Sequence, residues 1–140
     1  MTKQTIEKKL EELVYLYPTS QEPPKIPKSE YDAIYELFNS VGKDPKKFYA
    51  PDNEERIRIQ DNRIIYLDAR NIELEIISES IGNLKNLKLL IFGYNQIESI
   101  PESIGNLNNL ERVYFGDNPL NKKSIEFLKE LKEKGVNVIY

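Results

Sequence analysis

The second half of this 140-residue chain contains a repeat that is 23 residues long. The segment Ile77-Ser-Glu-Ser-Ile-Gly-Asn-Leu84 recurs as Ile100-Pro-Glu-Ser-Ile-Gly-Asn-Leu107, and the 23-residue blocks that begin at these two isoleucines are identical at 12 positions. A repeat of this length is one supersecondary unit that cannot bury its apolar side alone, so neighbouring units must stack to form a core. The repeat therefore predicts an array of stacked units with one continuous core.

Apolar residues and one asparagine keep a fixed spacing within each block. They are Leu87, Leu90, Phe92, Asn95 and Ile97 in the first block, and Leu110, Val113, Phe115, Asn118 and Leu120 in the second. Leu90 and Phe92 alternate with Ile91, as they would on the inward face of a short strand. Each asparagine follows at a bend, where its amide can hydrogen-bond backbone groups that the turn leaves unpaired. The spacing predicts short parallel strands and a ladder of asparagines beside them.

The pattern Leu-x-x-Leu-x-Leu-x-x-Asn-x-Leu resembles the leucine-rich repeat. The 23-residue blocks with Ile-Pro-Glu-Ser-Ile-Gly-Asn-Leu are similar to the cytoplasmic, Ras-binding-related members of that family. The resemblance covers about residues 57–140 and implies an α/β fold, a leucine-rich-repeat solenoid with a short parallel sheet. It also implies that the concave sheet face binds a protein partner, because small GTPases and other signalling proteins are bound there in the family.

The repeat weakens towards both ends. One repeat earlier, Ile64, Leu67, Ala69 and Leu74 fill the apolar positions, but Ile72 stands where the asparagine is expected. One repeat later, Val113 and Phe115 correspond to Val136 and Val138, which predicts a last strand over Gly135–Tyr140. Ser124 to Lys134 reads as a helix with Ser124 as its N-cap, Leu128 and Leu131 on its apolar face, and Gly135 as its terminator. We expect a C-terminal cap made of this helix and strand.

Residues 1–56 do not carry the repeat. Apolar spacing predicts one helix over Thr5–Tyr17 and a second over Ser29–Val41, with Ser29 as N-cap, Gly42 as terminator, and Tyr31, Ile34, Tyr35, Phe38 and Val41 on the apolar face. The Pro-rich linker between them should lack regular structure. We expect residues 1–56 to form a helical N-terminal cap region joined to the repeat domain, 57–140, in one structural unit. A separate helical pair on a flexible linker is the alternative.

Strands Ile57–Gln60 and Arg63–Leu67 flank Asp61-Asn62, which predicts a hairpin at the start of the repeat domain. On the strands that follow, the residues between the core positions face outward and form rows across the sheet. We predict one row of Asp68, Ile91, Tyr114 and Asn137, beside a row of Tyr66, Leu89 and Arg112. Tyr and Arg are enriched where proteins bind one another, and contiguous apolar exposure is uncommon on a surface without a partner. These seven residues are the predicted partner-binding site.

Two alternatives remain for this patch. The chain's own N-terminal segment could cover it, or its side chains could serve only to stabilise the sheet through cross-strand pairs. Gly93 and Gly116 occupy matching places in the repeat, and we interpret them as turn residues rather than as part of a binding site.

A different role follows from the last strand, which has no later strand to pair with. Its edge, with Val136, Val138 and Tyr140, invites pairing with another chain, so the alternative function is a structural or assembly protein that self-associates there. We expect a monomer rather than a homodimer, because the preceding helix shields this edge.

The composition argues against most kinds of chemistry. The chain has no Cys and no His, which removes thiolate and imidazole nucleophiles and the commonest metal ligands, and no phosphate-loop or dinucleotide motif occurs. Glu79 and Glu102 recur one repeat apart but are expected on a solvated turn. With a net charge of -3 and mixed charges throughout, a nucleic-acid partner is not expected. We expect no enzyme, no cofactor, no metal, no membrane segment and a cytoplasmic location.

Overall fold

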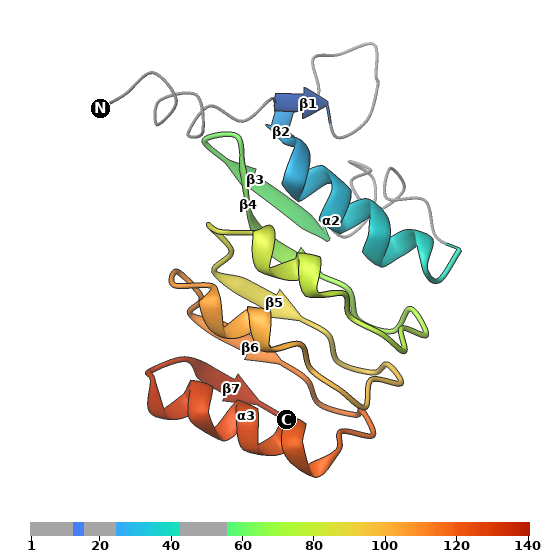
Figure 1. Ribbon diagram of the computed structural model, residues 1–140, viewed down its shortest axis with the longest axis vertical. Coiled ribbons are helices and arrows are strands. Elements are labelled where there is room, and N and C mark those ends of the chain that lie inside the picture. The colour runs from blue at the N-terminus through green and yellow to red at the C-terminus, as the bar shows by residue number, and fades with distance from the viewer. Residues whose placement is uncertain (1–12, 16–24, 43–55) are drawn as a thin grey trace.

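The computed structural model describes residues 13–15, 25–42 and 56–140, which form a layer of strands backed on one face by helices (Figure 1). The strands are β1 (Leu13–Tyr15), β2 (Lys25–Pro27), β3 (Ile57–Gln60), β4 (Arg63–Asp68), β5 (Leu89–Ile91), β6 (Arg112–Tyr114) and β7 (Asn137–Ile139). The helices are α2 (Lys28–Asn39), α3 (Lys122–Glu133) and two 3-10 helices, η2 (Glu79–Asn83) and η3 (Glu102–Asn106). The fold is mixed α/β, as the sequence predicted.

The repeat length sets the pairing of the central strands. The main sheet has the order β3-β4-β5-β6-β7, with β3 and β4 antiparallel and the remaining pairs parallel. Leu67 pairs with Leu90, and Leu90 pairs with Val113, so each partner lies one repeat further along the chain. All three side chains are fully buried. The predicted adjacent parallel strands and their inward positions are confirmed.

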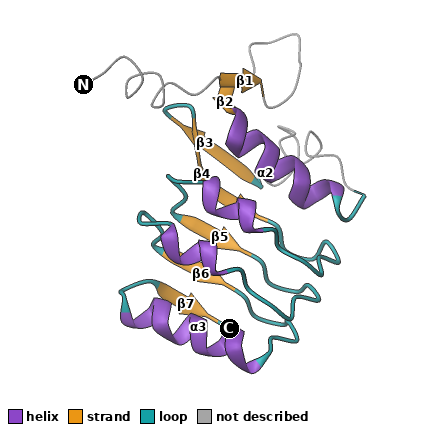
Figure 2. Cartoon of the chain, in the orientation of Figure 1, coloured by secondary structure: helices purple, strands orange, loops and turns teal. Residues whose placement is uncertain are grey.

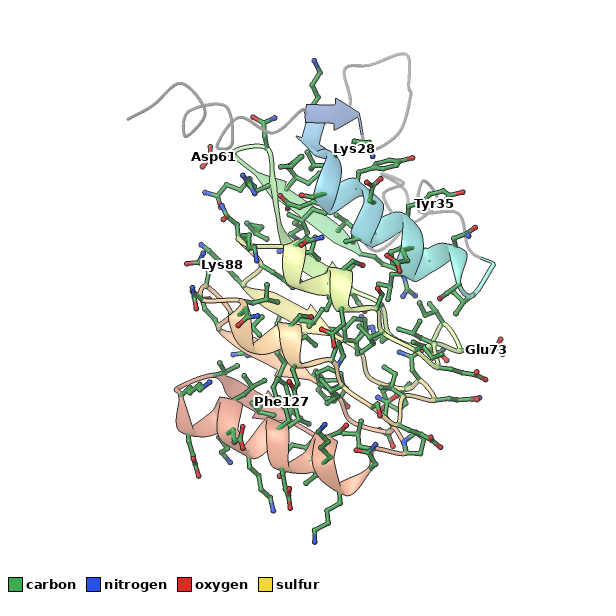
Figure 3. The ribbon with its side chains drawn as sticks, viewed as in Figure 1. Lys28, Tyr35, Asp61, Glu73, Lys88 and Phe127 are labelled. Atoms are coloured by element: carbon green, nitrogen blue, oxygen red, sulfur yellow. The ribbon has the colours of Figure 1, made fainter. Side chains whose placement is uncertain are left out.

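The hairpin before the repeats is also confirmed. Asp61 and Asn62 have φ angles of 52° and 61°, so both central residues of the turn are left-handed. This is the geometry of a type I′ turn, whose twist matches that of the two flanking strands. Asp and Asn tolerate the left-handed region better than most residues, which explains why the turn forms without glycine. Figure 3 shows Asp61 at the outer tip of the hairpin.

The register of the last strand differs from the prediction by two residues. Val113 pairs with Val138 and Tyr114 pairs with Ile139, whereas the repeat placed Val136 beside Val113. The last unit contains the 12-residue helix α3 where the earlier units contain a five-residue 3-10 helix, so two more residues pass before the strand begins. The inward and outward faces are unchanged, because a shift of two residues preserves the alternation of a strand.

Both α-helices begin earlier than predicted, and neither serine is an N-cap. The side chain of Asn121 caps α3 by accepting a hydrogen bond from the Ser124 backbone N at 2.8 Å. Ser124 is buried instead, where its Oγ donates to Glu98 O and accepts from Ile100 N. The N-cap residue of α2 is Pro27, which makes no side-chain cap bond, and Ser29 lies within the helix.

The buried face of α2 is only partly the predicted one. Ile34 and Phe38 are fully buried, but Ala33 and Leu37 take the remaining inward positions and Tyr35 is 49% exposed. Figure 3 shows the Tyr35 side chain directed away from the sheet. Periodicity alone is compatible with two overlapping apolar faces on this helix, and packing against the sheet determines which of them is buried.

The N-terminal region contains a strand pair that the sequence reading missed. β1 pairs antiparallel with β2, so the predicted helix over Thr5–Tyr17 is wrong at Leu13–Tyr15, and the rest of it lies outside the described residues. The Pro-rich linker was expected to lack regular structure, but it forms strand β2 at Lys25–Pro27. A short apolar run does not distinguish strand from helix by periodicity, and proline is tolerated at the end of an edge strand.

One core joins α2, the sheet and α3. It runs from Ile26, Ile34 and Phe38 through Leu67, Leu90 and Val113 to Leu128 and Leu131. Helix α2 contacts η2 and lies beside the hairpin in Figure 2. None of the helices in the described part of the chain is long and apolar enough to span a membrane.

Candidate functional site

Strand pairing arranges the outward residues of the sheet in two rows. One row is Arg58, Tyr66, Leu89, Arg112 and Asn137, and the other is Asp68, Ile91, Tyr114 and Ile139. We call these nine residues the outer face. The helices of the described residues lie on the opposite side of the sheet (Figure 2), so they do not cover it. Asn137 was predicted beside Tyr114, but the two-residue shift of β7 places it beside Arg112 and brings Ile139 beside Tyr114.

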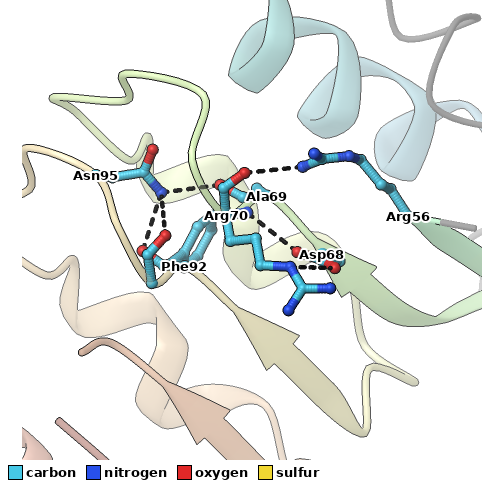
Figure 4. A network of polar contacts seen from close by, with 7 residues as sticks. Arg56, Asp68, Ala69, Arg70, Phe92 and Asn95 are labelled. Atoms are coloured by element: carbon cyan, nitrogen blue, oxygen red, sulfur yellow. Dashed lines mark hydrogen bonds and ion pairs between the residues drawn. The ribbon is translucent and has the colours of Figure 1, made fainter. Parts of the chain in front are cut away.

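Six of the seven predicted site residues lie at least partly open on this face. Tyr66, Leu89, Ile91 and Tyr114 are half-buried, while Arg112 and Asn137 are exposed. The exception is Asp68, which is only 1% exposed. Its carboxylate accepts a hydrogen bond from the Arg70 backbone N at 3.1 Å and pairs with Arg70 Nε at 3.2 Å (Figure 4). Asp68 therefore holds the Arg70 side chain in place and offers little surface to a partner.

The ring of Tyr114 lies against two glycines of the repeat. A Cβ atom placed on Gly93 would lie 2.1 Å from Cε1 of Tyr114, and one on Gly116 would lie 2.9 Å from its hydroxyl oxygen. Neither glycine has a positive φ, so the prediction that they serve as turn residues is wrong. Their missing side chains make room for the tyrosine ring, which fixes its orientation on the outer face.

At each bend, the residue that follows the repeat position of Gly93 and Gly116 has a left-handed backbone conformation. Asn71, Tyr94 and Asp117 stand one repeat apart and have φ angles of 54°, 57° and 58°. The backbone N of Asn71 donates to Gly93 O, and that of Tyr94 donates to Gly116 O, which ties successive bends together. An aromatic residue is unusual in this backbone region. Tyr94 is the functional candidate that the sequence reading missed, although its departure from the Asn and Asp of the neighbouring repeats marks it.

Tyr94 extends the apolar and aromatic surface of the outer face. It is 55% exposed, and its hydrogen bond with Tyr114 is the main cause that raises the pKa of Tyr114 above the ordinary value of 10.0, with burial next. A hydrogen bond raises a phenol pKa when the phenol donates, because the neutral form is stabilised. The two phenol side chains therefore lie close together beside the outer face.

Arginines gather around the other side of the same face. The guanidinium of Arg58 stacks over the ring of Tyr66, 4.9 Å from its centroid, and Arg56 Nη1 donates to Arg70 O at 2.9 Å. Burial raises the pKa of Tyr66, and the negative charge of Asp68 adds to that rise. With Arg112, four of the five arginines of the chain lie on or beside the outer face. Arg56 and Arg58 were missed because the hairpin strands were read only for pairing.

A hollow among the described residues lies elsewhere, between α3, η2 and η3. It has a volume of about 680 Å³ and is lined by Glu75, Glu79, Glu102, Glu126 and Glu130, with Ile76 and Phe127. Glu79 Oε2 accepts from Ser103 N, and Glu102 pairs with Lys123 at 3.7 Å on the surface. No group of three or more Asp or Glu in the described part of the chain is placed to hold a metal ion. The carboxylates of the hollow are therefore exposed, and Glu79 and Glu102 already have partners in the chain.

No protein-family model matches the chain, and no curated protein is significantly similar to it in sequence. The outer face, with its paired tyrosines and its arginines, therefore carries the functional argument.

Proposed function

We propose that this chain is a short leucine-rich-repeat protein that binds another protein on the outer face of its sheet. The observation that carries the proposal is a contiguous patch of half-buried aromatic and aliphatic side chains, Tyr66, Leu89, Ile91 and Tyr114, on four neighbouring positions of three strands. Continuous apolar exposure of this kind is typical of protein-binding surfaces, and Tyr and Arg are the residue types that contribute most to binding there.

Two features support the assignment to the leucine-rich repeats. Parallel strands pair at the repeat spacing of 23 residues, and Asn95 and Asn118 bond the backbone of neighbouring repeats as an asparagine ladder requires. From the resemblance we infer a small GTPase or another signalling protein as the kind of partner. The cytoplasmic location and the absence of catalysis that the sequence predicted stay predictions.

A photocrosslinking experiment tests the proposed surface. We would place p-benzoylphenylalanine at Leu89 on the outer face or, as a matched control, at Lys129 on the exposed side of α3, and irradiate cells that produce the protein. The proposal expects a discrete adduct with one other protein from position 89 that disappears in a Tyr114→Ala background. Equal adducts from both positions, or an adduct that survives Tyr114→Ala while stability falls, would contradict it.

Self-association through β7 is a second candidate function. β7 is the last strand in the sheet order among the described residues, and its bonds to β6 use Asn137 N and Ile139 O. The backbone groups of Val138 therefore point to the open edge, where a strand of another copy can pair. Light scattering over a range of concentrations decides this: a dimer whose fraction rises with concentration supports it, and a monomer throughout eliminates it.

A further inference from the structure

We infer that the outer face takes an extended acidic segment of its partner, whose carboxylates meet Arg58 and Arg112 while an apolar side chain rests on Leu89 between them. This inference rests on the proposed function and adds the chemistry of the partner. It is carried by the position of the two arginines in one row of the sheet.

Among the described residues, arginines are concentrated on the outer face and its border. The chain has a net charge of -3, yet the outer face and its border carry Arg56, Arg58, Arg70 and Arg112 against Asp68 and Asp117. Five exposed glutamates lie around the hollow between α3 and η3, with Lys123 beside them. A surface with more arginines than carboxylates attracts and orients an acidic ligand. Arginine in particular binds carboxylates with two parallel hydrogen bonds.

The row that holds Arg58 and Arg112 has a definite length. Arg58 pairs with Tyr66, Tyr66 with Leu89, and Leu89 with Arg112, so three strand spacings separate the two arginines. At about 4.8 Å per spacing, their backbones lie about 14 Å apart. In an extended peptide, residues i and i+4 face the same way and are about 13 Å apart, with residue i+2 between them. The matching peptide therefore has acidic residues at i and i+4, an apolar residue at i+2, and any residue at the two positions between them.

The neighbouring row favours a protein over a nucleic acid. It consists of Ile91, Tyr114 and Ile139 beside the buried Asp68, and aliphatic side chains have no counterpart in a phosphate backbone. The ring of Tyr66 is stacked by Arg58, and that of Tyr114 lies against Gly93, so neither tyrosine offers both ring faces to a base. Single-stranded nucleic acids bind where aromatic rings are open platforms.

Two synthetic peptides test the inference on the full chain. One is acetyl-Thr-Glu-Thr-Leu-Thr-Glu-Thr-amide, and the other replaces both glutamates with glutamine, which keeps shape and removes charge. Titrations followed by NMR at low salt should show at least tenfold tighter binding of the Glu peptide, with shifts on β4, β5 and β6. Arg112→Gln should reduce its binding to the level of the Gln peptide. Lys129→Gln, the same loss of charge on exposed α3, should leave it unchanged.

Other results overturn the inference. Equal binding of the two peptides, or an equal effect of Arg112→Gln and Lys129→Gln, eliminates the acidic segment. Tighter binding of a ten-nucleotide oligouridine than of the Glu peptide assigns the face to nucleic acid instead. The proposed function is judged separately by crosslinking from Leu89: if that adduct forms while the peptides bind equally, only the acidic segment is rejected, and if no adduct forms, the protein-binding function itself fails.

Discussion

The Asn95 side chain joins two successive repeats through their backbones. Its Oδ1 accepts hydrogen bonds from the backbone N of Ile72 and of Leu74, both at 3.0 Å, while its Nδ2 donates to Ala69 O and Phe92 O at 2.8 and 2.9 Å. Figure 4 shows the contacts made by Nδ2. Because the site is buried, water cannot replace these bonds if the amide is removed.

Replacing Asn95 with alanine should therefore be costly. We expect Asn95→Ala to lower the free energy of unfolding by about 3 kcal/mol or more, because several buried backbone groups lose their partners at once. Asn109→Ala is the control, since Asn109 is exposed and its side chain makes one hydrogen bond, to Lys85 O. Urea denaturation measures both variants, and similar losses in the two would show that the ladder does not stabilise the fold.

A second prediction concerns Gly93 and the ring of Tyr114. Gly93→Ala should destabilise the chain, since its Cβ would overlap the ring, by about 1–3 kcal/mol. In a Tyr114→Ala background the same change should cost little, because the ring that it meets is gone. A double-mutant cycle of unfolding free energies measures this coupling. Additive effects would mean that Gly93 is needed for another reason.

The hydrogen bond between Tyr114 and Tyr94 predicts a pH dependence. The pKa of Tyr114 is raised in the folded chain, so it keeps its proton at a pH where the unfolded chain has lost it, and the free energy of unfolding falls as the pH rises above about 10. Tyr94→Phe should move the pKa of Tyr114 back towards 10, whereas Tyr35→Phe on α2 should not. NMR titration of ring-labelled tyrosine follows both, and an unchanged Tyr114 pKa in Tyr94→Phe would refute the bond.

At the scale of elements, a buried carboxylate fastens α2 to the hairpin. Glu30 is fully buried, and its side chain accepts from Ile64 N at 2.9 Å and from Arg63 Nη1 at 3.1 Å. A buried charge is tolerated only with such partners. Its position in the first turn of the helix is also favourable for a negative charge.

Glu30→Gln should loosen this attachment. The glutamine side chain lacks the charge that pairs with Arg63, and its NH2 group would face one of the two N–H donors that Glu30 accepts from. We therefore expect a loss of about 1–3 kcal/mol in unfolding free energy. Asp32→Asn is the matched control, because Asp32 pairs with Lys28 on the exposed side of the same helix, where an ion pair contributes about 0.5 kcal/mol or less. Faster amide hydrogen exchange at Ile64 in Glu30→Gln alone would locate the effect at the contact.

At the scale of the whole molecule, the ends of the array share one core. Leu37 in α2 and Leu128 in α3 are both buried in the cluster that includes the sheet, and Figure 1 shows these two helices at opposite ends of it. Each repeat unit contacts mainly its neighbours, so a short array depends on both ends being covered.

Shortening a buried side chain in either end helix should therefore lower the stability of the whole chain, which unfolds in one transition. We expect Leu37→Ala and Leu128→Ala each to lower the unfolding free energy by about 2–5 kcal/mol. Circular dichroism and tyrosine fluorescence should report one shared midpoint in urea for each variant. An early, separate transition in Leu37→Ala would show instead that α2 is an independent unit.

Local rules were sufficient wherever a structure depends on neighbours along the chain. The strands around Leu67, Leu90 and Val113, the asparagines at the bends and the Asp61-Asn62 turn follow from periodicity and turn chemistry, since these act over a few residues. Most of the outward residues followed as well, because alternation along a strand assigns its faces.

Packing between distant segments determined the remaining features. The length of α3 shifts β7 by two residues, Arg70 draws Asp68 into a buried pair, and Tyr114 explains why residues 93 and 116 are glycines. The strand β1 forms in place of a helix because it pairs with β2, which lies beyond any window of helical periodicity. In each case the energy comes from a contact with a partner that sequence spacing does not name, so only the folded chain reveals it.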